Sequence, residues 1–475
     1  MIKSQTEKVY GWSRSTFSNS LVYRPSNIEE IYDIIQNSKK NNQKIACRGA
    51  GRSYGDNSLN EKEIILDVTN YNKIIDWNSQ SGIIKIQGGV TIEDILLQCT
   101  NSGWSLPVIP GTRYVTIAGA LANNVHGKNA FHQGCIGEHV NYFKIILADS
   151  NIYHCTRSKN SDLFYSAIGG LGLLGVIVEV GLKLRRITSY YLTSEVKRYN
   201  NIIDLYDDFE LLKDKYEYSI AWIDTIKSGN NLGRGEINYA QFLDDGDYKI
   251  TDHEIPKNSF GFISNKFLPK LTKIFLNTNT MRIINWLQVY SNIFSSDVQR
   301  QKISFSKFNF LIDMKYPYYN YFFKYGFFEY QPILPFNKSA KGFKDLIKIT
   351  QKYGFRSVQS SSKAYRNQNE EFLLSFPKNG FAVTLDIPKD FKRIKEQIKM
   401  FYEMNDVVIA NGGKIYLGKT PVINKTQFYE MYENLDRFLL IKNKYDPNSI
   451  FESNMYRRIM NLAKPDSPFS LEHSI

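Results

Sequence analysis

The stretch Cys47-Arg-Gly-Ala-Gly-Arg-Ser-Tyr-Gly-Asp-Asn57 places three glycines within seven positions. Gly49, Gly51 and Gly55 tolerate a positive φ, so successive backbone N–H groups can turn toward one anion such as a phosphate. The spacing G-x-G-x-x-x-G differs from the dinucleotide fingerprint G-x-G-x-x-G, and an extended segment, Glu63–Val68, follows it in place of a helix. The pattern therefore argues against a Rossmann fold. Taken alone, it fits a phosphate-binding loop and a simple glycine turn between strands equally well.

The composition is that of a large globular protein with an excess of positive charge. The chain has 475 residues, of which 42% are hydrophobic and 14% aromatic, so we expect about two or three domains with substantial cores. The formal net charge of +13 fits nucleic acid, an anionic membrane surface, a phosphorylated substrate, or simply a solvated lysine-rich surface. Because the basic residues are dispersed and no RNA-binding aromatic motif occurs, we expect no nucleic-acid partner.

The cysteine spacing and the hydropathy argue against several kinds of site and segment. Cys47, Cys99, Cys135 and Cys155 are widely spaced without a C-x-x-C pair, which argues against a disulfide framework and against a zinc site. We therefore expect isolated thiols and no metal. The first residues lack an apolar signal segment, and the most apolar run, Ile168 to Val178, is shorter than the roughly 18 residues of a membrane span. We expect a cytoplasmic protein, either soluble or peripheral to a membrane.

Up to about residue 190, strands and helices mix without βαβ regularity, which is typical of an α+β fold. Ser26, with Glu29 three residues later, predicts a capped helix start. Thr116 can cap a short helix of small residues, and such a helix allows close approach of a second backbone or of a flat ligand. The alternation from Val176 to Leu184 predicts a strand buried on one face.

Beyond residue 190 the character of the chain changes. From 191 to 411 aromatic residues become frequent, and we expect a sheet domain that closes over a site, although an ordinary aromatic core explains most of these rings as well. Gly412-Gly-Lys-Ile-Tyr416-Leu-Gly-Lys419 then returns to glycine and basic residues. A single long helix is predicted from about Thr426 to Lys444.

The order of these motifs resembles the flavoenzymes of the vanillyl-alcohol-oxidase type. A glycine loop, a Pro-Gly-Thr turn before a small-residue helix and a closing Asp446-Pro-Asn-Ser-Ile-Phe451 occur in sequence. The chain is more specifically similar to the decaprenylphosphoryl-β-D-ribose 2′-oxidase family, and the motifs that carry this likeness are Gly11-Trp12, Arg48–Asn57, Pro110–Arg113, His126–Asn129 and Tyr416-x-x-Lys419. The likeness covers nearly the whole chain and is most specific before residue 190.

This resemblance implies a fold and a reaction. The implied fold is a two-part FAD-binding domain of the PCMH type, residues 1–190 and 412–475, with an inserted antiparallel-sheet substrate (cap) domain, residues 191–411. The implied enzyme is an FAD-dependent oxidoreductase that oxidises the C2′ hydroxyl of polyprenylphosphoryl-β-D-ribose to the 2-keto sugar. A partner short-chain reductase would complete epimerisation to polyprenylphosphoryl-arabinose, a precursor of cell-envelope arabinan. A lipid-linked substrate also implies a place at the inner membrane face.

The resemblance also assigns site residues. The implied FAD-binding residues are Arg48, Gly49, Gly51, Arg52, Ser53, Tyr54, Gly55, Asn57, Gly111, Thr116, Ile117, Ala118, Gly119, Asn123, Asn124, Val125, His126, Val176 and Tyr416. The implied substrate-pocket residues are Lys128, Gln331, Lys363, Thr384 and Lys419. The Lys419 ammonium is expected to stabilise negative charge that develops on the flavin. Lys419, Tyr54 and His126 are the candidates to take the hydroxyl proton, and the sequence does not rank them.

Two departures from the family pattern affect the expectations. Arg52 stands where many relatives carry a histidine that tethers the flavin, so we expect FAD to be bound without a covalent link. Thr384 and Ala382 stand where the family pattern has cysteine and asparagine, which affects substrate fit more than chemistry. The same domain plan could instead serve oxidation of a soluble alditol or aldonolactone, and this alternative stays open.

Overall fold

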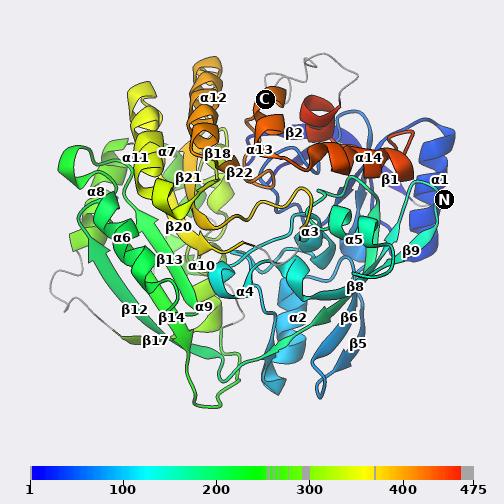
Figure 1. Cartoon of the computed structure of the whole chain (residues 1–475), viewed down its shortest axis with the longest axis horizontal. Coiled ribbons are helices and arrows are strands. Elements are labelled where there is room, and N and C mark those ends of the chain that lie inside the picture. The colour runs from blue at the N-terminus through cyan, green and yellow to red at the C-terminus, as the bar shows by residue number, and fades with distance from the viewer. Residues whose placement is uncertain are drawn as a thin grey trace.

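A computed structural model describes most of the chain, namely residues 3–252, 254, 257–259, 263–265, 267–275, 278–290, 300–367 and 371–461. Within these residues the strands form two large sheets, a four-stranded N-terminal sheet and two short two-stranded ribbons. Figure 1 shows the nine-stranded sheet with α6, α11 and α12 on one side of the molecule and the N-terminal sheets on the other. The mixed α/β architecture with antiparallel sheets that the sequence predicts is confirmed.

The four-stranded sheet carries the glycine loop. Its strand order is β1-β2-β4-β3, and β3 and β4 run parallel, so the loop that leaves β3 starts at the end of a buried strand. Helix α1 buries Ile31, Ile34 and Ile35 against Ile45 and Leu66 of this sheet. The elements are β1 (Ser4–Tyr10), β2 (Phe17–Tyr23), α1 (Ile28–Lys40), β3 (Ile45–Arg48) and β4 (Ile64–Asp67).

The five-stranded antiparallel sheet has the order β5-β6-β10-β8-β9 and supports the second wall of the site. Its strands are β5 (Ile74–Asn78), β6 (Ile83–Gln87), β8 (Val140–Ile146), β9 (Ile152–Cys155) and β10 (Val176–Lys183). The helices of this part are α2 (Ile92–Cys99), α3 (Ile117–Ala122), α4 (Ala130–Gln133) and α5 (Ser161–Ala167), and β7 (Trp104–Ser105) pairs with β11 (Arg185–Arg186). The short helix α3 contacts β10 and thereby brings residues 116–122 to the site.

The nine-stranded sheet is antiparallel and has the order β17-β12-β14-β13-β20-β21-β19-β22, with β18 also paired to β21. Alternate residues of its central strands face opposite ways, because side chains alternate along a strand. Val383 and Leu385 enter the core, whereas Thr384 and Asp386 face a cavity. The strands are β12 (Tyr191–Tyr199), β13 (Tyr218–Ile223), β14 (Gly235–Phe242), β17 (Gln301–Ser304), β18 (Phe327–Tyr330), β19 (Pro332–Leu334), β20 (Gln359–Tyr365), β21 (Gly380–Pro388) and β22 (Lys414–Ile415).

The remaining helices cover the sheets or link them. Helices α6, α11 and α12 pack on the core face of the nine-stranded sheet, and α14 packs on α5. Their bounds are α6 (Ile202–Leu212), α7 (Leu268–Phe275), α8 (Thr278–Tyr290), α9 (Phe305–Asn309), α10 (Leu311–Lys315), α11 (Phe336–Tyr353), α12 (Ile394–Ala410), α13 (Lys425–Met431) and α14 (Leu435–Tyr445), while β15 (Asn258–Ser259) and β16 (Ile263–Ser264) form a ribbon. Short helical turns are η1 (Val68–Asn70), η2 (Thr100–Ser102), η3 (Ile136–His139), η4 (Gly229–Asn231), η5 (Tyr319–Tyr321) and the π-helical η6 (Tyr456–Met460).

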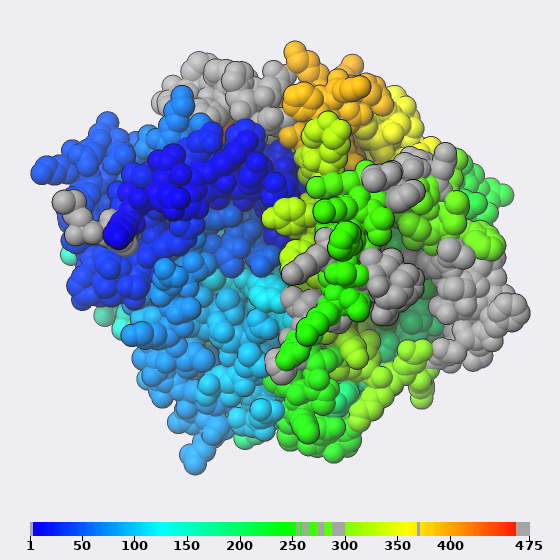
Figure 2. All heavy atoms as spheres, turned by 180° about the vertical axis from the view of Figure 1, so that it is seen from behind, coloured from blue at the N-terminus to red at the C-terminus, as the bar shows by residue number. Residues whose placement is uncertain are grey.

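One hydrophobic cluster joins the two halves of the molecule. It includes Ile84 and Val180 of the five-stranded sheet together with Ile237 and Val383 of the nine-stranded sheet. Seen from behind, the N-terminal residues and the middle of the chain meet along a continuous boundary (Figure 2). No helix in the described part of the chain combines the length and the apolar character that crossing a membrane requires.

The start of α1 lies one residue later than the sequence predicts. Asn27, not Ser26, is the N-cap, and its side chain accepts a hydrogen bond from the Glu30 amide at 2.9 Å. The Glu30 carboxylate in turn accepts from the Ser26 amide at 2.7 Å. The prediction of Ser26 with Glu29 was wrong because Ser and Asn are both good caps and two consecutive glutamates allow either register.

Two further elements differ from the sequence prediction. The single helix expected over 426–444 is two helices, α13 and α14, because the Tyr432 hydroxyl donates to the buried Ile415 carbonyl at 2.6 Å and the backbone turns there. Strand β10 is buried on both faces instead of one, since Val176 and Val178 enter one core cluster while Ile177 and Val180 enter another. A register irregularity between Ile177 and Glu179 shifts the alternation, which sequence periodicity does not reveal.

Candidate active site

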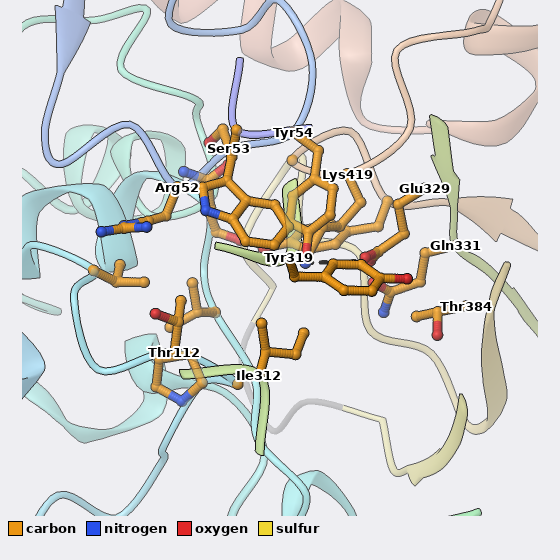
Figure 3. Close-up of a pocket in the computed structure, with 18 of the residues that line it drawn as sticks. Arg52, Ser53, Tyr54, Thr112, Ile312, Tyr319, Glu329, Gln331, Thr384 and Lys419 are labelled. Carbon is orange, nitrogen blue, oxygen red and sulfur yellow. Dashed lines mark hydrogen bonds and ion pairs between the residues drawn. The ribbon is translucent and has the colours of Figure 1, made fainter. Parts of the chain in front are cut away.

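A cavity of about 850 Å³ lies between the glycine loop and the face of the nine-stranded sheet that carries Glu329, Thr384 and Asp386. This volume is in the range of pockets that enclose cofactors and small molecules. Figure 3 shows Arg52 and Thr112 toward one end, Glu329, Gln331 and Thr384 toward the other, and Lys419 between them. Segments far apart in the sequence therefore meet around one elongated space.

The glycine loop presents bare backbone to this cavity. A Cβ added at Gly49 would lie 1.9 Å from Thr116 Oγ1, and one added at Gly51 would lie 2.1 Å from the Arg48 guanidinium. Gly51 also has a φ of +64°. Among the described residues, no hydrogen bond uses the amide N–H groups of residues 49–53 as donors. These amides are thus available to an anion in the cavity, as in a phosphate-binding nest.

Two arginines add positive charge to the loop. Arg48 donates to the Tyr10 carbonyl at 3.0 Å and to Ser58 Oγ at 3.2 Å, which fixes it under the loop. Arg52 lines the cavity and its Nε is buried without a hydrogen-bond partner in the described residues. Burial lowers the pKa of Arg52, and the nearby Asp313 carboxylate partly offsets this. An unpaired, partly desolvated guanidinium beside free amides fits the pyrophosphate of FAD.

The Pro-Gly-Thr turn and helix α3 form the facing wall. Thr116 Oγ1 is buried without a hydrogen-bond partner among the described residues, and Gly111, Ala118 and Gly119 line the cavity with little or no side chain. Asp313 holds this turn, because its carboxylate accepts from Thr112 Oγ1 at 3.0 Å and from the Arg113 amide at 2.9 Å. The small residues and the orphaned hydroxyl fit a flat, polar cofactor lying against the helix.

Three of the predicted FAD-binding residues do not line the cavity. Gly55 packs on Pro421, Ile117 is in the core with its amide bonded to the Val90 carbonyl, and Asn124 turns away to Ser375 Oγ at 2.8 Å. All other predicted site residues line it, namely Arg48, Gly49, Gly51, Arg52, Ser53, Tyr54, Asn57, Gly111, Thr116, Ala118, Gly119, Asn123, Val125, His126, Lys128, Val176, Gln331, Lys363, Thr384, Tyr416 and Lys419.

His126 sits in an aromatic box at the cavity wall. Its ring centroid lies 5.0 Å from those of Tyr365 and Tyr416, and Gln331 Nε2 lies 3.2 Å from its Nε2. Burial lowers the pKa of His126 well below its usual value, and the charges of Lys363 and Lys419 lower it further. His126 is therefore a neutral imidazole at physiological pH and a weak base.

Two partly buried amines, those of Lys128 and Lys363, line the same cavity. Burial lowers the pKa of Lys128 to about 7 and the pKa of Lys363 to about 8, and the charge of Lys363 contributes to the shift of Lys128. Lys128 donates to the Phe308 carbonyl, and Lys363 lies on β20 next to β21. Such a pair of poorly solvated amines favours an anionic ligand between them.

Lys419 contacts both Tyr54 of the glycine loop and the acidic residue Glu329. Its Nζ lies 3.4 Å from the centroid of the Tyr54 ring and 3.2 Å from Glu329 Oε1. The Tyr54 amide donates to the Gly418 carbonyl at 3.0 Å, which fixes the two segments together. Burial raises the pKa of Tyr54 well above its usual value, and the nearby Glu329 and Asp386 raise it further. Tyr54 therefore keeps its proton.

The sequence analysis missed Glu329 and Asp386, which both line the cavity. The Tyr319 hydroxyl donates to Asp386 Oδ2 at 2.9 Å, and Glu329 pairs directly with Asp386 across β18 and β21. A sequence signal for both existed, because Glu329 lies two residues before Gln331 and Asp386 lies two residues after Thr384. Residues two apart on a strand share a face.

Comparisons with known families agree with the geometry. A family model described as the FAD binding domain matches residues 20–156, and one described as D-arabinono-1,4-lactone oxidase matches residues 250–459. Together with the loop of free amides, the orphaned Arg52 and the small-residue wall, these matches define an FAD-dependent oxidoreductase that acts on CH–OH groups.

Individual relatives place the chain more closely. It is 28% identical to the decaprenylphosphoryl-beta-D-ribose oxidase of Mycolicibacterium smegmatis over 465 residues, which cover 96% of this chain and 97% of the relative. It is 18% identical to the L-gulonolactone oxidase of Mus musculus over 95% of this chain and 96% of the relative, and 27% identical to a putative D-arabinono-1,4-lactone oxidase of Neurospora crassa over 38% and 33%. These comparisons support membership of the decaprenylphosphoryl-β-D-ribose oxidase family, and the cofactor is FAD.

Proposed function

We propose that this protein oxidises the C2′ hydroxyl of a polyprenylphosphoryl-β-D-ribose to the 2-keto sugar, the first half of an epimerisation to the arabinose epimer. The whole-length similarity to a decaprenylphosphoryl-ribose oxidase supports this substrate class. The observation that carries the proposal is the pair of partly buried amines, Lys128 and Lys363, on the cavity wall. A neutral sugar or lactone would bring no negative charge to these amines, whereas a phosphodiester supplies one.

The residues divide into roles along the cavity. The amides of residues 49–53, Arg52 and Thr116 would hold the pyrophosphate and ribityl chain of FAD, and FAD would supply the two-electron oxidant. Lys419 would stabilise negative charge that develops during hydride transfer. Lys128, Lys363, Gln331 and Thr384 would hold the phosphorylated sugar. Because an arginine occupies position 52, the protein would retain FAD by shape and charge without a covalent bond.

The proposed domain division follows from the same assignment. Residues 1–190 and 412–475 would form the FAD-binding domain, and residues 191–411 would form the substrate (cap) domain inserted between them. The nine-stranded sheet supports this division, because most of its strands come from residues 191–411. The short β22 pairs with β19 of the same sheet, so the boundary near residue 412 joins the two domains closely.

The proposed epimerisation would need a partner reductase, and a lipid-linked substrate would lie at a membrane surface. The α7–α8 surface, defined here as residues 267–275 and 278–286, supports the second point, since Phe267, Ile283 and Trp286 are exposed there, as are Lys270 and Lys273. Other residues of this surface, Leu268, Thr272, Met281 and Asn285, line the cavity. Apolar and basic side chains at a cavity rim suit the inner face of an anionic membrane, where they would admit a polyprenyl chain.

A second candidate function is oxidation of a soluble alditol or aldonolactone. The match of residues 250–459 to the D-arabinono-1,4-lactone oxidase family favours it. Steady-state turnover with a dye acceptor separates the two candidates. We expect turnover with polyprenylphosphoryl ribose and much weaker turnover with alditols or aldonolactones at equal concentration. Efficient turnover of the soluble compounds together with none of the lipid-linked sugar would replace the proposal by its alternative.

A further inference from the structure

The acidic wall of the cavity holds two carboxyl groups for which the assigned roles give no task. Glu329 on β18 and Asp386 on β21 are direct partners in the antiparallel ladder, so their side chains leave the same face of the sheet. Both are buried and both line the cavity. Two ionised carboxylates this close in a buried site repel each other strongly, so one of them keeps a proton.

The surrounding contacts indicate which member is ionised. Glu329 faces the Lys419 ammonium at 3.2 Å, which stabilises a carboxylate there. Burial raises the pKa of Asp386 well above its usual value, and the negative charge of Glu329 raises it further. Asp386 Oδ2 accepts a hydrogen bond from the Tyr319 hydroxyl, and Asp386 Oδ1, like Glu329 Oε1, is buried without a hydrogen-bond partner in the described residues.

The other titratable groups around the pair are weaker candidates for a base. Burial raises the pKa values of Tyr54, Tyr319, Tyr365 and Tyr416, so these phenols keep their protons. His126 is a weak base between Lys363 and Lys419. Lys128 and Lys363, whose pKa values burial lowers to about 7 and about 8, are assigned above to the substrate phosphate, and the charge of Glu329 favours the ammonium form of Lys363. Glu329 is the buried anion that faces the cavity beside Lys419.

We propose that Glu329 and Asp386 form a carboxyl pair that holds a single proton and that the ionised member accepts the proton of the substrate hydroxyl. This inference rests on the proposed oxidation of a hydroxyl group. In that reaction the C–H bond breaks and its electron pair leaves as hydride to FAD, while the O–H bond breaks and its proton moves to Glu329. The carbon–oxygen single bond becomes a carbonyl, and the substrate has lost two electrons and two hydrogens.

The pair also explains how Lys419 changes partner during the reaction. Before proton transfer the Lys419 ammonium is neutralised by Glu329. Once Glu329 is protonated, the pair is neutral, and the ammonium charge becomes available to balance the negative charge that arrives with the hydride. Proton transfer and charge stabilisation are thereby coupled through one ion pair of 3.2 Å.

The first test measures the shared proton without flavin or substrate. Infrared spectra of the apoprotein at neutral pH should show a protonated carboxyl band that disappears in Asp386→Asn, the variant that removes the proton-carrying member of the pair. Glu138→Gln is the matched control, because Glu138 is a buried glutamate ion-paired with Arg366 at 2.9 Å and lies outside the cavity lining. Its spectrum should keep the band. Absence of the band in the wild type, or its persistence in Asp386→Asn, would overturn the proposal.

The second test follows flavin reduction in the holoenzyme by stopped flow with polyprenylphosphoryl ribose. Glu329→Gln should slow reduction by about 10²–10⁴-fold, with unchanged flavin content. Reduction at the wild-type rate would overturn the proposal. If the wild-type flavin is reduced only by a soluble aldonolactone, the proposed substrate fails instead, and the same variant measured with that lactone still decides the role of the pair.

Discussion

Binding of the phosphorylated substrate should draw protons from solution, because Lys128 and Lys363 are only partly charged in the free cavity. Their pKa values are lowered to about 7 and about 8. An anion beside them favours the ammonium forms and raises both pKa values. If both amines are fully protonated in the complex, proton uptake rises from about 0.1 at pH 6 to about 0.6 at pH 7 and about 1.4 at pH 8. Affinity should therefore fall as the pH rises through this window.

Isothermal titration calorimetry in buffers with different ionisation enthalpies measures this uptake. The dithionite-reduced holoenzyme and a short-chain polyprenylphosphoryl ribose allow binding without turnover. In Lys128→Met only Lys363 remains, so uptake at pH 7 should fall from about 0.6 to about 0.1. The matched control is Lys414→Met, since burial also lowers the pKa of Lys414 to about 8 but this amine donates to the Ser375 carbonyl at 2.7 Å and does not line the cavity. Binding without proton uptake between pH 6 and 8, or equal uptake in wild type and Lys128→Met, would refute the assignment of the amine pair.

Four other predictions concern flavin binding, the role of Lys419 and the membrane surface. Lys419→Met should lower kcat by about 10²–10³-fold with full flavin content, and full turnover with FAD bound would contradict its role. Gly51→Ala and Gly412→Ala both place alanine at a positive φ, so each should destabilise the protein by roughly 1–2 kcal/mol in chemical denaturation. Only Gly51→Ala should be purified without flavin, because its Cβ would meet the Arg48 side chain in the cofactor loop, whereas a Cβ at Gly412 meets nothing among the described residues. Acid precipitation should release the flavin into the supernatant, and a yellow pellet would show a covalent link. In cosedimentation at low salt, the double variant Lys270→Glu and Lys273→Glu should lose about 1 kcal/mol of binding free energy to anionic vesicles per lysine. The control variant Lys338→Glu and Lys341→Glu, which changes two exposed lysines of α11, should bind like wild type.

The loop at 47–57 illustrates how far local sequence reaches. Its glycine spacing predicts bare backbone for an anion, and the structure leaves the amides of residues 49–53 without partners in the described chain. The sequence alone left a plain strand turn as an equal alternative. The choice between the two depends on Thr116 and Arg52, which approach the loop only in the folded protein.

The pairing of Glu329 with Asp386 could not be predicted from local sequence. Glu329 and Asp386 are separated by 57 positions in the chain, and nothing near either residue shows that β18 and β21 pair in this register. Gln331 and Thr384 were found through family motifs, whereas their neighbours two positions away were not. The pairing is set by which faces the long strands bury, a property of the whole nine-stranded sheet.

The sequence by itself determined the composition of the cofactor loop, the small-residue helix after Thr116 and the presence of basic groups at 128, 363 and 419, because each depends on residue type and short spacing. Only the tertiary structure decided that Lys128 and Lys363 lose solvent together, that Lys419 faces Glu329, and that Asn124 turns away from the cavity. Charge state and direction depend on burial and on neighbours brought together by long-range strand pairing. Free energies of that kind arise from the fold and cannot be assigned to a residue before its surroundings are known.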